Sequence, residues 1–397
     1  MKVTTHFYIL DFSMKRGFIL KRNRDLYKYM IGGTLIIFIG FMSLIDFFTP
    51  KKIFSEMENR RLEEKPEFSM KKLFGGNYTS SYEKYVSDQF PFRNFFIGVK
   101  SDCERIAGKV ENNEVYLGKD GYLFEKVKTP QREEFEKKID AINSFAVSNP
   151  NVDKYFMLVP NSVKILEDKL PKFAPVDDEL ALIERVQKSL DKNISFVDVY
   201  DTLLSKNHEY IYYKTDHHWT TKGAFYAYEK FCEDVGITPH NEGYFDINEA
   251  TCEFYGSLYS KSGFRRLSPD SIQLYIPKTK KELEVEYFDE EKIEDTLYDF
   301  SGLNKKDKYT IFLGGNHPLI KISSNVNEKK LLIVKDSYAN SLIPFLTDHF
   351  GQIYVVDLRY FDEDLSSLIE KENIGDVLIL FNVKTFFEDD SIRKISW

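Results

Sequence analysis

From about residue 131 the chain alternates amphipathic helical patterns with short apolar runs, and few folds accommodate that alternation. Apolar residues recur at helical spacing over 133–148, 179–190 and 365–372, and another helix is expected between Ser337 and Phe350. The apolar runs, which are interpreted as strands, lie at 155–159, 194–199, 331–334, 353–356 and 377–381. Strands that alternate with helices are typical of a parallel sheet covered on both faces, so the sequence predicts an α/β fold.

The composition indicates a folded protein with a substantial core. The 397 residues are 42% hydrophobic and 15% aromatic, and the formal net charge is −8. An acidic chain without a clustered basic surface is not expected to bind nucleic acid. The three cysteines, Cys103, Cys232 and Cys252, form no C-x-x-C pair, so neither a zinc knuckle nor a disulfide framework is expected.

One apolar segment near the N-terminus decides the expected location. Residues 29–45 are uncharged, and the segment 29–48 has about the 20 residues that a membrane-spanning helix needs, so it is interpreted as a transmembrane anchor. The tail 1–28 is rich in Lys and Arg, and the positive-inside rule predicts that it stays in the cytoplasm. No small-residue cleavage signature follows, which favours an uncleaved anchor over a removed signal peptide. The C-terminal remainder is then expected outside the cytoplasmic membrane.

Two regions are expected after the anchor. Residues 49–130 are charged and interrupted by Gly and Pro, and they are interpreted as a membrane-proximal stalk. Within them, 115–125 indicates a hairpin, because Lys-Asp-Gly separates two aromatic-rich runs. Residues 131–397 form the expected α/β domain. Its middle part, about 237–310, is turn-rich and charged, and it is interpreted as an inserted region beside the functional edge of the sheet.

The tetrapeptide Asp216-His217-His218-Trp219 places a carboxylate, two imidazoles and an indole on one short segment. In extended backbone, residues two apart face the same side, so Asp216 can hold the His218 ring in one tautomer while His217 points away and Trp219 packs beneath. A histidine oriented in this way can act as the base for a serine nucleophile. A structural histidine is the other interpretation. Adjacent histidines do not usually bind one metal through the same face, so no metal site is expected.

Ser337 is the candidate nucleophile because it follows the apolar run 331–334. Ligands of parallel α/β sheets gather at the carboxyl ends of strands, and a helix that begins just beyond would favour negative charge there. The Ser337 backbone N–H could donate to an oxyanion. Further candidate donors are Gly315 and Asn316, which follow the strand-like 309–313, and Asn340. The alternative is that these polar residues only cap helices and form turns.

Several segments together resemble the bacterial DHHW proteins, which are similar to the alginate O-acetyltransferase-like group of the SGNH hydrolase superfamily. These segments, found between about residues 55 and 390, are ENRRL, DQFPFR, VYLGKDGYLF, TDHHWTTKGA and LLIVKDSYANSLIPFL. The resemblance implies a flavodoxin-like α/β/α fold of the SGNH-hydrolase type, an extracytoplasmic location and a triad of Asp216, His218 and Ser337. Many SGNH hydrolases carry the serine first, whereas the order Asp, His, Ser is shared by the alginate-acetylation relatives. Those relatives have a non-His residue where His217 stands, which leaves His217 without a role.

The activity that the resemblance implies is O-acyl transfer, with acetyl as the expected group, to a cell-surface or secreted polysaccharide. Because acetyl-coenzyme A is cytoplasmic, the expected partner is a membrane-bound O-acyltransferase that supplies the acyl group, and no cofactor is expected. The alternatives are a polysaccharide acetylesterase and a non-catalytic glycan-binding or assembly protein. A metal-dependent hydrolase built on Asp216, His217 and His218 is a further alternative.

Overall fold

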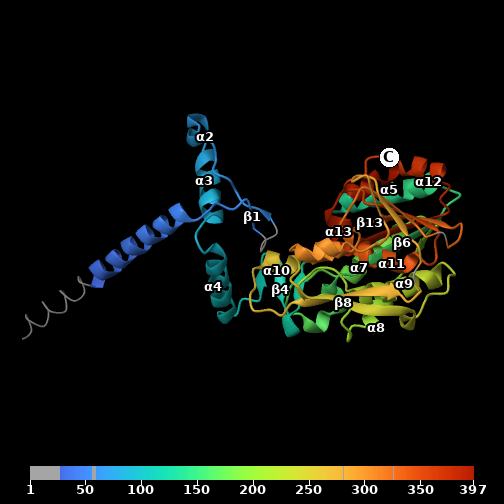
Figure 1. The fold of residues 1–397 in the computed structure, drawn as a ribbon, viewed down its shortest axis with the longest axis horizontal. Helices are drawn as coiled ribbons and strands as arrows, with labels where there is room; N and C mark the ends of the chain where they lie inside the picture. The colour runs from blue at the N-terminus through green and yellow to red at the C-terminus, as the bar shows by residue number, and fades with distance from the viewer. Residues whose placement is uncertain (1–26, 56–59, 280, 325) are drawn as a thin grey trace, which may run out of the picture. The chain divides into compact units, whose positions relative to one another are not determined.

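The structure, a computed structural model, describes residues 27–55, 60–279, 281–324 and 326–397 (Figure 1). The chain divides into two compact units, of which the first ends at Ile97 and the second contains Gly98–Trp397. The cytoplasmic tail expected at 1–28 lies outside the described residues except for its last two positions, and the segment ENRRL lies partly outside them. The domain boundaries given above stay predictions.

The first unit contains an apolar helix, Tyr27–Phe48, of 22 residues. This length suits a membrane span or a signal sequence, and its most apolar stretch is not buried against the rest of the protein. Beyond the helix, the Gln89 side chain holds the backbone of Lys52, bonding its N–H at 3.0 Å and its carbonyl at 2.8 Å. The other elements that begin in this unit are β1 (Phe54–Ser55), β2 (Arg60–Arg61), α2 (Met70–Phe74), α3 (Asn77–Asp88) and α4 (Arg93–Ile106).

The second unit is built around an eight-stranded sheet with the strand order β11-β10-β12-β14-β13-β15-β6-β7. The five strands from β14 to β7 are parallel, and β12, β10 and β11 continue the sheet in antiparallel pairing. The predicted α/β fold with a parallel sheet is confirmed, and it carries an antiparallel edge. The strands are β6 (Asp153–Val159), β7 (Ile194–Phe196), β10 (Glu284–Tyr287), β11 (Lys292–Glu294), β12 (Leu319–Ser323), β13 (Lys330–Lys335), β14 (Gln352–Val356) and β15 (Asp376–Asn382).

The parallel strands follow the flavodoxin order when counting starts at β13. Counted as β13, β14, β15, β6 and β7, they have the spatial order 2-1-3-4-5, so the chain is a circular permutation of that arrangement. β13 lies between β14 and β15, where the strand order reverses. Open α/β sheets bind their ligands at the carboxyl ends of the strands at such a point. Ser337 follows β13 at this position.

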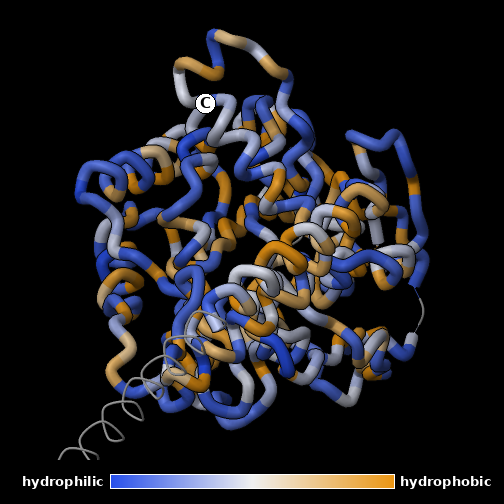
Figure 2. The backbone as a smooth tube through the Cα atoms, turned by 90° about the vertical axis from the view of Figure 1, so that its left-hand side faces the viewer, coloured by the Kyte–Doolittle hydropathy of each residue, from blue (hydrophilic) through white to orange (hydrophobic). Residues whose placement is uncertain are grey.

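Helices cover both faces of the sheet, as the neighbours of β6 show (Figure 1). Tyr155 meets Phe231 of α9 on one face, and the next residue, Phe156, meets Phe386 of α13 on the other. The buried side chains of these layers are mostly apolar, and hydrophilic stretches dominate the outer loops in Figure 2. The expected α/β/α arrangement is therefore confirmed. The helices of this unit beyond α4 are α5 (Arg132–Ser148), α6 (Ser162–Ile165), α7 (Glu179–Ser189), α8 (Tyr200–Ser205), α9 (Thr221–Asp234), α10 (Ser257–Ser262), α11 (Ile343–Leu346), α12 (Leu365–Glu372) and α13 (Val383–Glu388).

Two smaller antiparallel sheets complete the second unit. The predicted hairpin over 115–125 is confirmed as β4 (Val115–Leu117) and β5 (Leu123–Glu125), with β3 (Glu111–Asn112) paired to β4. The other sheet pairs β8 (Phe245–Phe254) with β9 (Asp270–Pro277). The turn after β8 leads into α10, which lies against the Asp216 segment.

Two local predictions are wrong. Residues 309–313 do not form a strand, because a 3₁₀ turn over Lys308–Ile311 is capped by Asp307, whose carboxylate accepts from the Tyr309 N–H at 3.2 Å. The continuous helix expected before Phe350 is also absent. A 3₁₀ turn, Ser337–Ser341, and the four-residue α11 take its place, and the Pro344 ring in α11 is compatible only with a first helical turn.

Candidate functional site

The turn that carries Ser337 is held by the aspartate before it. Asp336 Oδ1 accepts from the Tyr338 N–H at 2.9 Å, which caps the 3₁₀ turn. Asp336 Oδ2 accepts from the backbone and side-chain nitrogens of Asn382 at 2.8 and 2.6 Å. Asn382 ends the neighbouring strand β15, so one buried carboxylate joins two strand ends. Ser337 is thus fixed at the carboxyl edge of the sheet.

The segment that carries Asp216 is joined to the same turn by Trp219. Its indole N–H lies 2.9 Å from the Tyr338 carbonyl and 3.1 Å from Ser341 Oγ, and the ring is fully buried. A β-bridge between Tyr212 and Trp219 closes the Asp216 segment into a loop. Trp219 therefore packs beneath the loop, as predicted, and its N–H bond fixes the distance between the two segments. The Thr220 hydroxyl then caps α9 by accepting from the Gly223 N–H.

The structure brings Asp216, His218 and Ser337 together in one chain of hydrogen bonds. Asp216 Oδ1 lies 2.5 Å from His218 Nδ1, and His218 Nε2 lies 2.8 Å from Ser337 Oγ. Because an ionised carboxylate can only accept, Nδ1 carries the ring proton and Nε2 of the neutral imidazole faces the serine hydroxyl. Such an arrangement can remove a proton from the serine as its oxygen attacks a carbonyl.

Two further contacts hold the acid and the base, and the sequence did not single them out. Asp216 Oδ2 accepts from the Ser257 N–H at 2.7 Å, at the start of α10. The Tyr309 ring lies parallel to the His218 ring, with centroids 3.8 Å apart, and its hydroxyl bonds Ser341 Oγ at 3.0 Å. Tyr309 comes from the segment that was predicted to be a strand, and no local motif marks it as a neighbour of the histidine.

The pKa values of this group reflect burial and mutual charge. Burial by itself would raise the pKa of Asp216, but the neighbouring histidines outweigh it and hold that pKa well below its usual range. Burial, followed by the charge of His217, lowers the pKa of His218 to about 4 in spite of Asp216. His218 is therefore neutral at pH 7, which is the form that accepts a proton.

His217 does not point away from the pair, contrary to the sequence-based expectation. Its ring centroid is 3.8 Å from that of His218, and its Nδ1 lies 2.7 Å from Ser257 Oγ and 3.5 Å from Asp216 Oδ1. Burial opposes its protonation, but Asp216 raises its pKa to about 8. Since 28% of the side chain is exposed, water screens part of this interaction. The charge of His217 adds to the larger effect of burial in keeping His218 neutral.

The candidate oxyanion donors differ in whether they already donate a hydrogen bond within the protein. The Gly315 N–H donates to Phe312, and the Asn340 amide donates to the Gly315 carbonyl at 3.1 Å and to Asn316 Oδ1 at 3.3 Å. Asn316 Oδ1 also accepts from Lys335 at 2.7 Å. Among the described residues, no acceptor pairs with the Asn316 amide nitrogen or with the Ser337 backbone N–H. These two groups are the donors left for an oxyanion.

Lys335, which orients Asn316, belongs to a buried charge cluster that sequence reasoning missed. Its ammonium lies 3.5 Å from Asp357, which Arg359 contacts through two nitrogens at 2.8 and 2.5 Å. Burial lowers the pKa of Lys335 to about 8, against the pull of Asp357. The sequence signal for this cluster was a lysine at the end of an apolar strand, because a buried ammonium group requires acceptors nearby.

Asp216, His217 and His218 offer ligand atoms within 4.8 Å of one another, the spacing of a possible metal site. Two ligands of a tetrahedral zinc ion, each about 2.0–2.1 Å from the metal, lie roughly 3.3 Å apart. The 2.5 Å between Asp216 Oδ1 and His218 Nδ1 is shorter and corresponds to a hydrogen bond. Asp216 Oδ1 and His218 Nδ1 are therefore bonded to each other and do not have the spacing of two ligands of one zinc ion.

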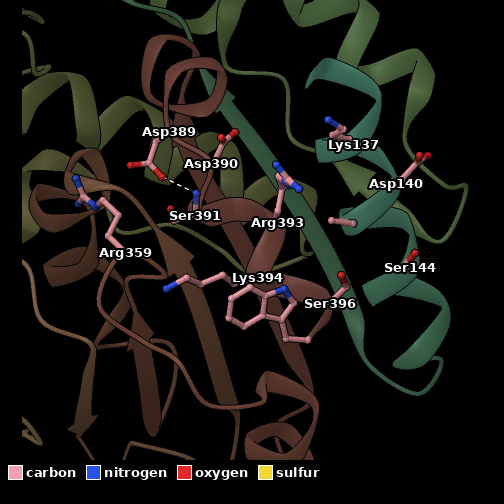
Figure 3. A pocket seen from close by; sticks show the side chains of 12 residues that line it. Lys137, Asp140, Ser144, Arg359, Asp389, Asp390, Ser391, Arg393, Lys394 and Ser396 are labelled. Carbon is pink, nitrogen blue, oxygen red and sulfur yellow. Dashed lines mark hydrogen bonds between the residues drawn. The ribbon is translucent and has the colours of Figure 1, made fainter. Parts of the chain in front are cut away.

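Two hollows that share lining residues lie in this region, and the smaller one borders His217. A cleft of about 440 Å³ is bordered by His217 and Ser257, together with Arg359 and Asp389. A larger hollow of about 800 Å³ shares Arg359 and Asp389 and extends past Lys394, as Figure 3 shows. Neither hollow is lined by Asp216, His218 or Ser337, but the smaller cleft borders His217 and Ser257, which both lie next to Asp216.

The chain belongs to the DHHW family. The model of this family, described as DHHW protein, matches residues 117–356. A DHHW family protein from Eubacterium siraeum is similar in structure, with 26% identity and a TM-score of 0.63 over 72% of this chain and 96% of that chain. Bacillus cereus PatB1, solved with a sulfonyl adduct, has 22% identity and a TM-score of 0.60 over 71% of this chain and 98% of that chain. The O-acetyltransferase domain of Pseudomonas putida AlgJ is more distant, with 14% identity and a TM-score of 0.44 over 69% and 93% of the two chains. The chain matches no curated protein.

Proposed function

We propose that this chain is an extracytoplasmic O-acyltransferase that transfers an acyl group, expected to be acetyl, to a hydroxyl of a cell-surface or secreted polysaccharide. The observation that carries the proposal is the hydrogen-bonded chain from Asp216 through His218 to Ser337. This geometry performs acyl transfer on several unrelated folds. Its position at the strand-order reversal of an α/β sheet, where such folds bind their ligands, supports the proposal, as does the nearby cleft that His217 borders.

In the proposed reaction, His218 Nε2 takes the Ser337 proton as Oγ attacks the carbonyl of an acyl donor. The leaving group receives that proton from His218, and an acyl-serine ester remains. A sugar hydroxyl then attacks the ester, gives its proton to His218, and the restored Ser337 takes that proton back. Asp216 keeps the imidazole in one tautomer and stabilises its charged form. The Ser337 N–H and the Asn316 amide are the proposed oxyanion donors.

We further propose that the helix Tyr27–Phe48 anchors the chain, with the second unit outside the cytoplasm. An outward-facing acyltransferase needs an acyl donor from across the membrane, because acyl-coenzyme A is made in the cytoplasm. A membrane-bound O-acyltransferase is the proposed partner that supplies it. The basic residues before the helix favour this orientation.

Covalent labelling tests the nucleophile directly. We expect phenylmethylsulfonyl fluoride to modify Ser337 in the folded full chain, detected as an intact-mass increase and located by peptide mapping. His218→Ala should slow the labelling by about 10²–10⁴-fold, because the serine loses its base. His208→Ala is the matched control, since this histidine is exposed and lies outside the site, and it should label normally.

The acyl step is measured with 4-nitrophenyl acetate as donor. Ser337→Ala should abolish nitrophenol release, and wild-type protein should release it faster when oligosaccharide acceptors are added. If Ser337 is not labelled in folded protein, the proposed chemistry is wrong. If the acetyl group is transferred only to water and is released as free acetate, whatever saccharide is added, the protein is an esterase.

A further inference from the structure

A second histidine–carboxylate pair lies outside the proposed catalytic chain. His317 Nδ1 is 3.0 Å from both carboxylate oxygens of Asp289, and because a carboxylate can only accept, Nδ1 carries a proton. The opposite nitrogen, Nε2, is buried and has no hydrogen-bond partner in the described part of the chain. His317 is only 6% exposed. Buried acceptor atoms normally receive a hydrogen bond, so a donor group is missing beside this nitrogen.

The residue that carries the free nitrogen borders a small hollow. His317 lines a cavity of about 270 Å³, together with Asp299, Gly314, Tyr287 and Tyr298. Gly314 keeps the space in front of the histidine open, because a Cβ on it would lie 3.3 Å from His317 Nε2 and 3.9 Å from Asp299 Oδ2. His317 Nε2 and Asp299 Oδ2 therefore both lie near Gly314.

The hollow does not suit a metal ion. Within the described residues, three ligand atoms close enough to share one ion occur only at Asp216, His217 and His218. The other charged groups of the hollow are a mixture of carboxylates and ammonium groups, and Lys292 already pairs with Glu294 at 2.8 Å. Its volume lies just below the ~300–1,000 Å³ of ordinary small-molecule sites, so it fits a ligand of about one ring. Aromatic walls with acceptors and donors between them suit a polyhydroxylated ring.

The same short loop reaches both the hollow and the Ser337 turn. Gly314 and His317 line the hollow, whereas Gly315 and Asn316 between them bond Asn340, and Asn316 also bonds Lys335. The loop from Gly314 to His317 therefore contacts both the hollow and the turn that carries the serine.

We propose that this hollow is a saccharide subsite that holds one ring of the acceptor glycan, with ring hydroxyls donating to His317 Nε2 and Asp299. The proposal rests on the acyl transfer proposed above, and it assigns the part of the protein that selects the acceptor. In this proposal His317 and Asp299 contact the acceptor, and Asp289 positions His317 through its Nδ1–H.

Saccharide binding is measured by saturation-transfer difference NMR on the full chain, in a detergent without a sugar headgroup. The probes are the methyl glycosides of glucose, glucosamine and N-acetylglucosamine. We expect at least one to bind, and His317→Phe, which keeps a ring but removes the acceptor, to weaken it about tenfold. Asp299→Asn, which can still cap its 3₁₀ turn, should also weaken binding. Glu291→Gln, an exposed carboxylate outside the hollow, is the control and should bind normally.

The outcomes separate this inference from the proposed chemistry. Ser337→Ala should bind the saccharide as the wild type does, and His317→Phe should keep the wild-type rate of Ser337 labelling. Failure of labelling in the wild type rejects the acyltransferase but leaves saccharide binding to be judged separately. The subsite is rejected if none of the three glycosides binds, if binding is unchanged in folded His317→Phe and Asp299→Asn, or if only ethanolamine, tested as an ammonium probe, binds.

Discussion

At the residue scale, two adjacent histidines have different roles because their surroundings differ. His218 is buried between Asp216 and Ser337, and its pKa falls to about 4. His217 lies at the edge of the cleft, and its pKa rises to about 8 beside the same carboxylate. Between these values one ring is charged and the other is neutral. The neighbouring charge is one reason why the base is ready to accept a proton at neutral pH.

Replacing His217 tests this interpretation. In His217→Gln the positive charge beside His218 is removed, so the pKa of His218 should rise by about one pH unit. A histidine must be neutral to act as base, so labelling of Ser337 falls as pH drops through the His218 pKa. The acid limb of labelling rate against pH should therefore move upward from its wild-type midpoint near pH 4. An unchanged acid limb, measured over the range where both proteins remain folded, would show that His217 carries no charge there.

At the element scale, the start of α10 positions the carboxylate. The Ser257 N–H bonds Asp216, and the preceding residue, Gly256, touches the same side chain. A Cβ on Gly256 would lie 2.2 Å from the Asp216 Cβ, which no side-chain adjustment can relieve. Glycine is needed here for close approach between two segments. The reason is not local conformation, because the Gly256 φ of −80° suits any residue.

Gly256→Ala should therefore damage the site through Asp216. We expect labelling of Ser337 to slow by at least about tenfold, and the free energy of unfolding to fall by about 1–3 kcal/mol, because the added methyl forces the backbone apart. Gly375→Ala is the matched control, since its Cβ would meet nothing within 4 Å. Equal labelling rates in both variants would contradict the proposed role of the α10 turn.

At the scale of the whole molecule, a buried polar network links α7 to the Ser337 turn. Glu179 Oε1 accepts from the Asn161 N–H at 2.5 Å, and the Asn161 side chain donates to Asn382, which binds Asp336. Glu179 Oε2 is buried without a partner among the described residues. Burial raises the pKa of Glu179 to about 8, so the folded protein keeps a proton that the unfolded chain releases near pH 4.5.

This proton makes stability depend on pH. The pKa of Glu179 is higher in the folded state than in the unfolded state. The stability that its proton contributes is therefore lost as pH rises from about 4.5 to about 8, and Glu179 changes the stability little outside that window. Glu179→Gln removes the titration, and it should be more stable than the wild type at pH 8–9, on the order of 3 kcal/mol, but not at pH 4. Denaturant unfolding at several pH values measures the difference. Glu184→Gln, on the exposed face of the same helix, should show no such trend.

Features that depend on residue spacing within a short segment could be predicted from the sequence, whereas contacts between distant segments could not. Apolar periodicity is a local property, so the alternation of helices and strands, the hairpin and the α/β class were all predictable from sequence. Residues 309–313 were assigned to a strand from their apolar character, but the cap at Asp307 outweighs that character and a 3₁₀ turn forms. The contact of Tyr309 with His218 depends on packing and has no sequence signature.

The sequence by itself determined the fold class, the apolar N-terminal helix and the facing of Asp216 and His218, because these depend on residue spacing within short segments. Only the tertiary structure decided what lies around them. Ser337 meets His218 across 119 residues because β13 is placed in the middle of a permuted sheet and Trp219 joins the two loops. The position of His217, the free nitrogen of His317 and the proton on Glu179 also depend on burial, which is set by the assembled layers.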